Sequence, residues 1–195
     1  MNFGRTLLSW ICLTVAVGKS AMAEDAQLEV GSPAPEFTVK DDQGKDWKSS
    51  DHFGKKIVVV YFYPADLTGG CTKQACGFRD DMAKLQGAGV EVVGVSGDSV
   101  ENHQLFKADR QLPFTLLADE AGEVAHKFGV PVTIETKVAS VEKSDGTKIS
   151  LTRKATAKRW TFVVGADGKV AYKNTMVQAA EDSQSILKAV AALKK

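Results

Sequence analysis

The strongest hydrophobic signal in the chain is an unbroken apolar run at residues 57–63, where most side chains are β-branched or aromatic. Such a run predicts a strand covered on both faces, as at the centre of a sheet with helices outside it. A second run, at residues 90–96, resembles the first. Between them lies a helical pattern of apolar residues that ends at two glycines: Phe78, Met82 and Leu85, then Gly87 and Gly89. Strand, helix and strand within about 40 residues predict a right-handed βαβ unit.

Weaker patterns on either side of this unit predict the remaining elements. A turn signal at residues 41–44 indicates a small hairpin near the start of the chain. After the unit, Ser99 can cap a helix that runs to about Arg110, with Leu105 and Phe106 on its inner face. The other expected elements are a strand at 115–117, a helix at 120–128, strands at 160–164 and 170–173 joined by a turn, and a final helix at about 180–193 with apolar residues Ile186, Val190 and Leu193.

A segment at residues 133–158 interrupts this order of elements. Its apolar residues alternate on both sides of a turn signal at 144–147, which predicts an inserted hairpin at about 134–153. Nothing in this hairpin indicates chemistry, so we interpret it as a surface elaboration. Together the patterns predict an α/β fold with a central mixed sheet, flanking helices, an N-terminal hairpin and this inserted hairpin.

The first 23 residues are expected to be a signal peptide. Arg5 supplies a positive start, residues 7–17 carry no charge, and Ala-Met-Ala at 21–23 has the small-x-small pattern of a signal-peptidase site. The uncharged stretch is shorter than the roughly 20 apolar residues of a spanning helix. Cleavage after Ala23 and export are therefore favoured over the alternative, an uncleaved membrane anchor. The domain proper would then be residues 24–195, in the periplasm or another extracytoplasmic space.

Composition limits the classes of function. The chain has 195 residues, of which 44% are apolar, so one domain can bury a substantial core. Its 25 basic and 24 acidic residues give a net charge of +1, which creates no long-range field for nucleic acid or anionic lipid. Neither class of partner is expected.

Cysteine and histidine residues give no metal-binding pattern. Cleavage of the signal peptide would remove Cys12 and leave two cysteines, in a compartment where disulfides can persist. The cysteines lack paired zinc-type spacing. The three histidines share no ligand spacing either, and we interpret them as surface or capping residues: His52, His103 and His126. No metal and no cofactor are expected.

Cys71 falls at the start of the helix that follows the first buried strand. In an open α/β sheet, chemistry collects where strands end and helices begin, and the free N–H groups of a helix start favour the nucleophilic thiolate. Cys76 is five residues further on. In a helix that spacing separates the Cα atoms by about 8.6 Å, beyond the limit near 7 Å for a disulfide. If the two cysteines pair, the first turns of the helix must therefore unwind.

The residues around Cys71 resemble the active-site motif of the peroxiredoxins. Pro64, Thr68 and Cys71 stand at the spacing Pro-x-x-x-Thr-x-x-Cys, and residues 70–80 are similar to the bacterioferritin-comigratory or Q-type branch. The likeness runs from residue 31 to the C-terminus, except for the insertion. Shorter supporting stretches lie at residues 31–37, 93–98, 112–119, 128–131 and 159–162. The resemblance implies a thioredoxin-like fold.

The resemblance also implies a thiol-dependent peroxidase of antioxidant defence that reduces hydrogen peroxide and organic hydroperoxides. Cys71 would be the peroxidatic cysteine that becomes a sulfenic acid, and Cys76 the resolving cysteine that forms an intramolecular disulfide with it. Thr68 would offer its hydroxyl to the peroxide, Arg159 would stabilise the thiolate and the developing oxyanion, and Pro64 would shield the pocket from water. Thioredoxin or a similar dithiol protein would recycle the enzyme, which is expected to be a monomer.

Two other functions stand beside this one. A thioredoxin-like disulfide oxidoreductase would carry Cys-x-x-Cys, which is absent. An exported copper-binding assembly factor would carry two cysteines four apart and a distal histidine, whereas here the spacing is five and no proline follows Cys76. Two departures from the family pattern are also present. Gln74 stands where many relatives have glutamate, and the long insertion directly precedes Arg159.

Overall fold

The computed structural model describes Met1 and residues 28–193. The predicted signal peptide, apart from Met1, and its cleavage site lie outside the described residues. Within the described part of the chain, no helix combines the length and the apolar character needed to cross a membrane.

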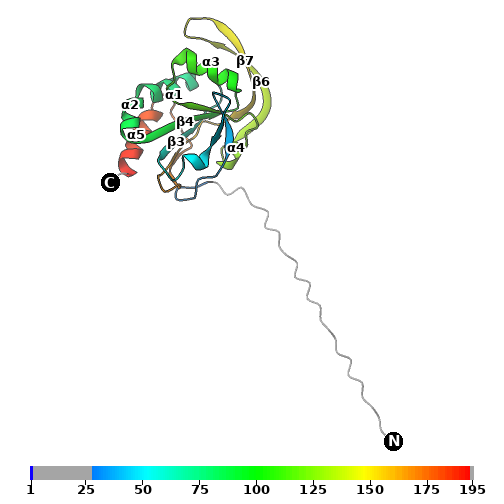
Figure 1. Cartoon of the computed structure of the whole chain (residues 1–195). Coiled ribbons are helices and arrows are strands. Elements are labelled where there is room, and N and C mark those ends of the chain that lie inside the picture. The colour runs from blue at the N-terminus through cyan, green and yellow to red at the C-terminus, as the bar shows by residue number, and fades with distance from the viewer. Residues whose placement is uncertain (2–27, 194–195) are drawn as a thin grey trace.

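A mixed sheet of seven strands forms the centre of the fold within residues 28–193, and helices cover both of its faces (Figure 1). The strand order is β2-β1-β5-β4-β3-β8-β9. Strands β3, β4 and β5 are parallel, and β8 runs antiparallel to β3. The bounds are β1 Thr38–Asp41, β2 Asp46–Lys48, β3 Ile57–Phe62, β4 Val90–Ser96, β5 Thr115–Ala118, β8 Thr161–Val164 and β9 Val170–Asn174. The predicted α/β architecture and N-terminal hairpin are confirmed.

The predicted central strand is β3, and both of its faces are buried. Val59 and Tyr61 join the hydrophobic cluster under α1, α2, α3 and α5, whereas Val60 and Phe62 join the cluster under α4. The helix bounds are α1 Gly69–Asp80, α2 Met82–Gly87, α3 Val100–Arg110, α4 Glu123–Lys127 and α5 Asp182–Leu193, with a short 3-10 helix η1 at Ser49–Asp51. Burial of alternate residues on opposite faces explains why the strand reads as a continuous apolar run.

The structure corrects the single helix expected between β3 and β4. The helix breaks at Asp81, which has the non-helical backbone angles φ −94° and ψ 5° and separates α1 from α2. The Asp81 carboxylate accepts hydrogen bonds from Ser183 Oγ at 2.9 Å and Lys84 Nζ at 2.8 Å. Side-chain bonds to a neighbouring helix thus favour the break, and the local sequence pattern contains no sign of them.

One smaller prediction is wrong at a helix surface. Ser99 does cap α3, because its Oγ accepts from the Asn102 N–H at 3.3 Å, but only Phe106 faces the core and Leu105 is 44% exposed. One residue along a helix is a rotation of about 100°, which takes Leu105 off the buried stripe. Leu193, the last residue of α5, is also 44% exposed because it lies beyond the buried part of that helix.

The inserted segment is a long antiparallel hairpin of β6 Val132–Glu142 and β7 Lys148–Ala157. It forms a separate two-stranded sheet that arches over the end of the molecule near α3 (Figure 1). Val141 and Leu151 are nevertheless buried in the core under α1 and α3. The predicted hairpin is confirmed, but it is packed into the fold and is more than a surface elaboration.

Candidate active site

Cys71 lies in the first turn of α1, as predicted, and its side chain is 2% exposed. The N-cap residue is Thr68, whose hydroxyl does not cap the helix and instead donates to the Ala65 carbonyl at 3.0 Å. Thr68 therefore leaves the first N–H groups of α1 available to an anionic sulfur or to an oxygen bound beside it. Leu67, just before Thr68, has a positive φ of 56°, a strained conformation often found at functional sites.

Arg159 reaches the sulfur from the segment between β7 and β8. Its Nη2 donates to Cys71 Sγ at 3.2 Å, and its Nη1 donates to Gln74 Oε1. Gly70 permits this approach, since a Cβ there would stand 3.3 Å from Arg159 Nη2. A fixed guanidinium donor stabilises a thiolate, so the insertion does not displace the most distant predicted site residue.

Behind Arg159 lies a buried chain of hydrogen bonds that sequence reasoning missed. Gln74 Nε2 donates to Asp182 Oδ2 at 2.7 Å, and Thr161 Oγ1 donates to the same oxygen at 2.7 Å. All three side chains are at most 1% exposed. Burial raises the pKa of Asp182, while the bonds from Thr161 and Gln74 and the charge of Arg159 act in the opposite direction. No motif signals Asp182, because only the fold brings the start of α5 to the start of α1.

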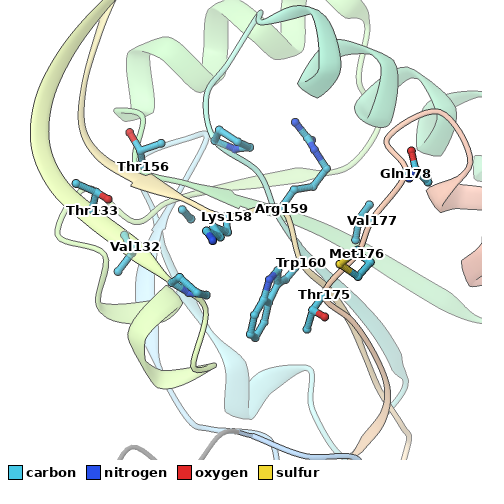
Figure 2. A pocket seen from close by; sticks show the side chains of 13 residues that line it. Val132, Thr133, Thr156, Lys158, Arg159, Trp160, Thr175, Met176, Val177 and Gln178 are labelled. Atoms are coloured by element: carbon cyan, nitrogen blue, oxygen red, sulfur yellow. The ribbon is translucent and has the colours of Figure 1, made fainter.

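Pro64 and Arg159 line one groove, of about 580 Å³, beside the sulfur. Figure 2 shows its lining, in which the Arg159 side chain extends away from the Trp160 ring and Met176 lies on the segment that follows β9. Cys71 and Thr68 are not part of this lining. Pro64 and Arg159 thus both border this groove, while the Arg159 guanidinium also contacts Cys71 Sγ.

Cys76 is half-buried in the same unbroken helix as Cys71, and both thiols are free. In α1 the two Cα atoms are held at the helical separation of about 8.6 Å, too far for a disulfide. The structure therefore shows the arrangement in which the two cysteines cannot pair. Among the described residues, no group of three or more His, Cys, Asp or Glu side chains is placed to hold a metal ion.

The expectation that all three histidines are surface or capping residues is wrong for His103. It is fully buried, and its Nδ1 lies 2.8 Å from Asp66 Oδ2. Asp66 also accepts from Tyr63 OH at 2.7 Å and donates its backbone N–H to Asp98 Oδ2 at 2.9 Å. Burial lowers the pKa of His103, but the charge and hydrogen bond of Asp66 raise it overall. This network fixes the loop between β3 and α1 that carries Thr68.

The other two histidines lie outside this network. His52 is half-buried, pairs with Glu91 at 2.8 Å and stacks on Trp47. His126 is exposed in α4, in agreement with the expected surface position.

Comparisons with known proteins place the chain in a family. Residues 30–173 match the model of the AhpC/TSA family. Over 106 residues the chain is 55% identical to the chloroplastic peroxiredoxin Q of Sedum lineare, a match that covers 54% of this chain and 56% of the relative. Over 105 residues it is 52% identical to the putative peroxiredoxin bcp of Coxiella burnetii, covering 54% of this chain and 69% of the relative. The chain thus spans about half the length of the chloroplastic relatives that it matches.

Solved structures agree with this placement. The crystal structure of peroxidoxin BcpB from Mycobacterium tuberculosis has a TM-score of 0.71 and 28% identity, over 87% of this chain and all of that one. Peroxiredoxin Q of Xanthomonas campestris has a TM-score of 0.68 and 29% identity, over 88% of this chain and all of that one. The chain belongs to the AhpC/TSA family, in its peroxiredoxin Q and bcp branch, and it has the predicted thioredoxin-like fold.

Proposed function

We propose that the chain is a thiol-dependent peroxidase that reduces hydrogen peroxide and organic hydroperoxides in antioxidant defence. The observation that carries the proposal is the Arg159 guanidinium on Cys71 Sγ at the uncapped start of α1. Family membership supports it, and a related bacterioferritin comigratory protein from Xanthomonas campestris is described by its alkyl peroxide reduction activity.

In the first step the Cys71 thiolate attacks one oxygen of the O–O bond. A sulfur–oxygen bond forms, the O–O bond breaks, and the leaving oxygen takes up a proton and departs as water or an alcohol, so that Cys71 becomes a sulfenic acid. Arg159, 3.2 Å from the sulfur, stabilises the thiolate and the charge that develops on the leaving oxygen. The Thr68 hydroxyl donates its proton to the Ala65 carbonyl, so its oxygen accepts a hydrogen bond from the peroxide. Pro64 limits the access of water to the reacting sulfur.

In the second step Cys76 attacks the sulfenic sulfur. The S–S bond forms, the S–O bond breaks, and the hydroxyl leaves as water. Because the helix holds the two cysteines apart, α1 must open locally before this step. A thioredoxin-type dithiol protein then returns both cysteines to thiols and becomes a disulfide itself.

Peroxide consumption with a dithiol regenerating system tests the proposal. Cys71→Ser should lose turnover, because it removes the thiolate that attacks the peroxide and leaves Cys76 without the Arg159 contact at the helix start. Cys76→Ser makes the same change five residues further along α1 and should still permit the first oxidation but not recycling by thioredoxin. Turnover by Cys71→Ser at the wild-type rate would refute the assignment.

We propose further that the protein is exported and acts as a monomer. The charge pattern of residues 5–23 supports export. A monomer agrees with a resolving cysteine on the same helix as Cys71. The mass of the protein secreted by expressing cells should correspond to a chain that begins at Glu24, and sedimentation should give one chain per particle. The full-length mass, or a stable dimer, would contradict the respective statement.

A further inference from the structure

Gln74, one of the residues between the two cysteines on α1, is hydrogen-bonded to another helix. Gln74 is fully buried. Its Nε2 donates to Asp182 Oδ2 at the start of α5, at 2.7 Å, while its Oε1 accepts from Arg159 Nη1. One glutamine side chain therefore joins the first turns of α1 both to α5 and to the cation that contacts Cys71.

We propose that Gln74 and Asp182 form a clasp that keeps α1 helical and reactive toward peroxide, and that release of this clasp gates the approach of Cys76 to Cys71. The proposal deepens the proposed function and rests on it. Gln74 and Asp182 act through Arg159 and through the helix, so both are positioning residues.

The clasp lies inside the segment that must open. A disulfide closes a loop of residues 71–76, and the helical separation of about 8.6 Å has to shrink below about 7 Å for it to form. Gln74 is in the middle of that loop, and its amide cannot stay on Asp182 while the backbone around it leaves the helix. Release also removes the partner of Arg159 Nη1. The conformation that reacts with peroxide and the conformation that forms the disulfide therefore exclude each other.

Release leaves a buried carboxylate short of partners. Asp182 Oδ2 accepts from Gln74 and Thr161, and within the described residues Asp182 Oδ1 has no hydrogen-bond partner. After opening, only the 2.7 Å bond from Thr161 would remain. Loss of a hydrogen bond to a buried charged group is costly, so the clasp resists opening.

A second contact between α1 and α5 lies outside the opening segment. Ser183 Oγ donates to Asp81 Oδ2 at 2.9 Å, beyond Cys76 and at the break between α1 and α2. It can persist while residues 71–76 unwind. Ser183→Ala is therefore a matched control, because it removes a buried hydrogen bond between the same two helices without touching the clasp.

The test compares Asp182→Ala, Gln74→Met and Asp182→Asn with Ser183→Ala and the wild type. Gln74→Met keeps the side-chain length but removes both hydrogen bonds, and it provides a second test should Asp182→Ala fold poorly. Asp182→Asn keeps an oxygen that can accept from Gln74. Hydrogen exchange of residues 69–80 in the reduced chain measures opening. Stopped-flow fluorescence after one equivalent of hydrogen peroxide measures disulfide formation, and mass spectrometry measures sulfinic acid at Cys71.

Asp182→Ala and Gln74→Met should each accelerate exchange in residues 69–76 and disulfide formation by roughly tenfold, the effect of one lost buried hydrogen bond. Both variants should also need a higher peroxide concentration before Cys71 is oxidised to sulfinic acid, because Cys76 converts the sulfenic acid to the disulfide sooner. Asp182→Asn and Ser183→Ala should stay within about twofold of the wild type in these readouts. If Asp182→Asn increases the rates of exchange and disulfide formation by less than Asp182→Ala does, that result would also support the clasp.

The proposal is overturned if exchange and disulfide formation are unchanged in both Gln74→Met and Asp182→Ala. It is equally overturned if Ser183→Ala changes them as much, since the effect would then be general loosening. The exchange measurement uses reduced protein without peroxide. Failure of the wild type to consume peroxide would therefore refute the proposed function. Unchanged exchange in Gln74→Met and Asp182→Ala, in a chain that is an active peroxidase, would refute only the clasp.

Discussion

The contact between Arg159 and Cys71 joins residues that are 88 positions apart in the chain. The guanidinium is half-buried and held by hydrogen bonds, so it needs no reorganisation when charge develops during attack on the peroxide. A donor held in this way has a large effect on rate. Gln74 on the other nitrogen fixes the orientation of the guanidinium.

Arg159→Met should lower the second-order rate constant for oxidation of Cys71 by about 100-fold or more, the usual cost of losing one such donor. Stopped-flow fluorescence with hydrogen peroxide measures this rate. Arg153→Met removes an arginine that binds Thr156 in the hairpin, so it is the control and should react like the wild type. A wild-type rate in Arg159→Met would show that the guanidinium does not assist the reaction.

Residues that belong to a contiguous motif could be predicted from the sequence, and residues that depend on packing could not. Cys71 follows from its place at a helix start, and Pro64, Thr68 and Arg159 follow from family resemblance. Asp182 meets this site only because α5 packs on α1. His103 shows the same limit, since a single histidine in a helix gives no sign that a buried carboxylate faces it.

Two elements meet at a close approach where β4 ends and β7 passes over it. A Cβ on Gly97 would stand 2.2 Å from the Ala155 carbonyl oxygen, so only glycine fits unless the backbone moves. The hairpin is held here as well as by its buried Val141 and Leu151. This contact explains how a segment inserted directly before Arg159 leaves the active site in place.

Gly97→Ala should therefore destabilise the fold by about 1–3 kcal/mol, the usual range for overpacking a tight interior contact. The free energy of unfolding in urea measures the loss. Gly87→Ala is the matched control, because a Cβ there meets nothing within 4 Å and alanine favours a helix. Equal stability of the two variants would mean that β7 can shift away from β4 without cost.

The period of apolar residues was sufficient to predict most elements. Strands β3 and β4 each carry an unbroken apolar run, and the inserted hairpin carries an alternating pattern, and both patterns match the structure. The break at Asp81 could not be predicted in this way, because Ser183 and Gln184 bind its carboxylate from another helix. The burial of Val141 likewise depends on where the hairpin folds back.

At the scale of the whole molecule, the described residues include a buried ionisable cluster, His103, Asp66 and Asp98, next to the loop between β3 and α1. Burial lowers the pKa of His103, but the charge and hydrogen bond of Asp66 and the charge of Asp98 together outweigh burial and raise that pKa overall. Burial, together with the charge of Asp66, raises the pKa of Asp98 to about 6. Both groups bind protons more strongly in the folded state than in the unfolded state. Their contribution to stability is therefore greatest at low pH and is lost as pH rises through the folded values.

The free energy of unfolding contributed by this cluster should therefore fall from about pH 4, where Asp98 begins to lose its proton in the unfolded chain, and the part of the fall above pH 6.5 should be due to His103. His103→Asn keeps a donor toward Asp66 but cannot titrate, so its stability should lack the fall above pH 6.5. Urea unfolding at half-unit pH steps measures both curves. Parallel curves for the two proteins above pH 6.5 would contradict this account.

In the proposed cycle peroxide oxidises Cys71, and Cys76 then bonds to it as α1 opens. Trypsin cleavage after Lys73 separates the two cysteines, so digestion without reduction tests the claim directly by mass spectrometry. After one equivalent of hydrogen peroxide and alkylation of free thiols, the fragments at residues 57–73 and 74–79 should remain joined, with two hydrogens lost. Recovery of both fragments separately, with both cysteines alkylated, would contradict the account.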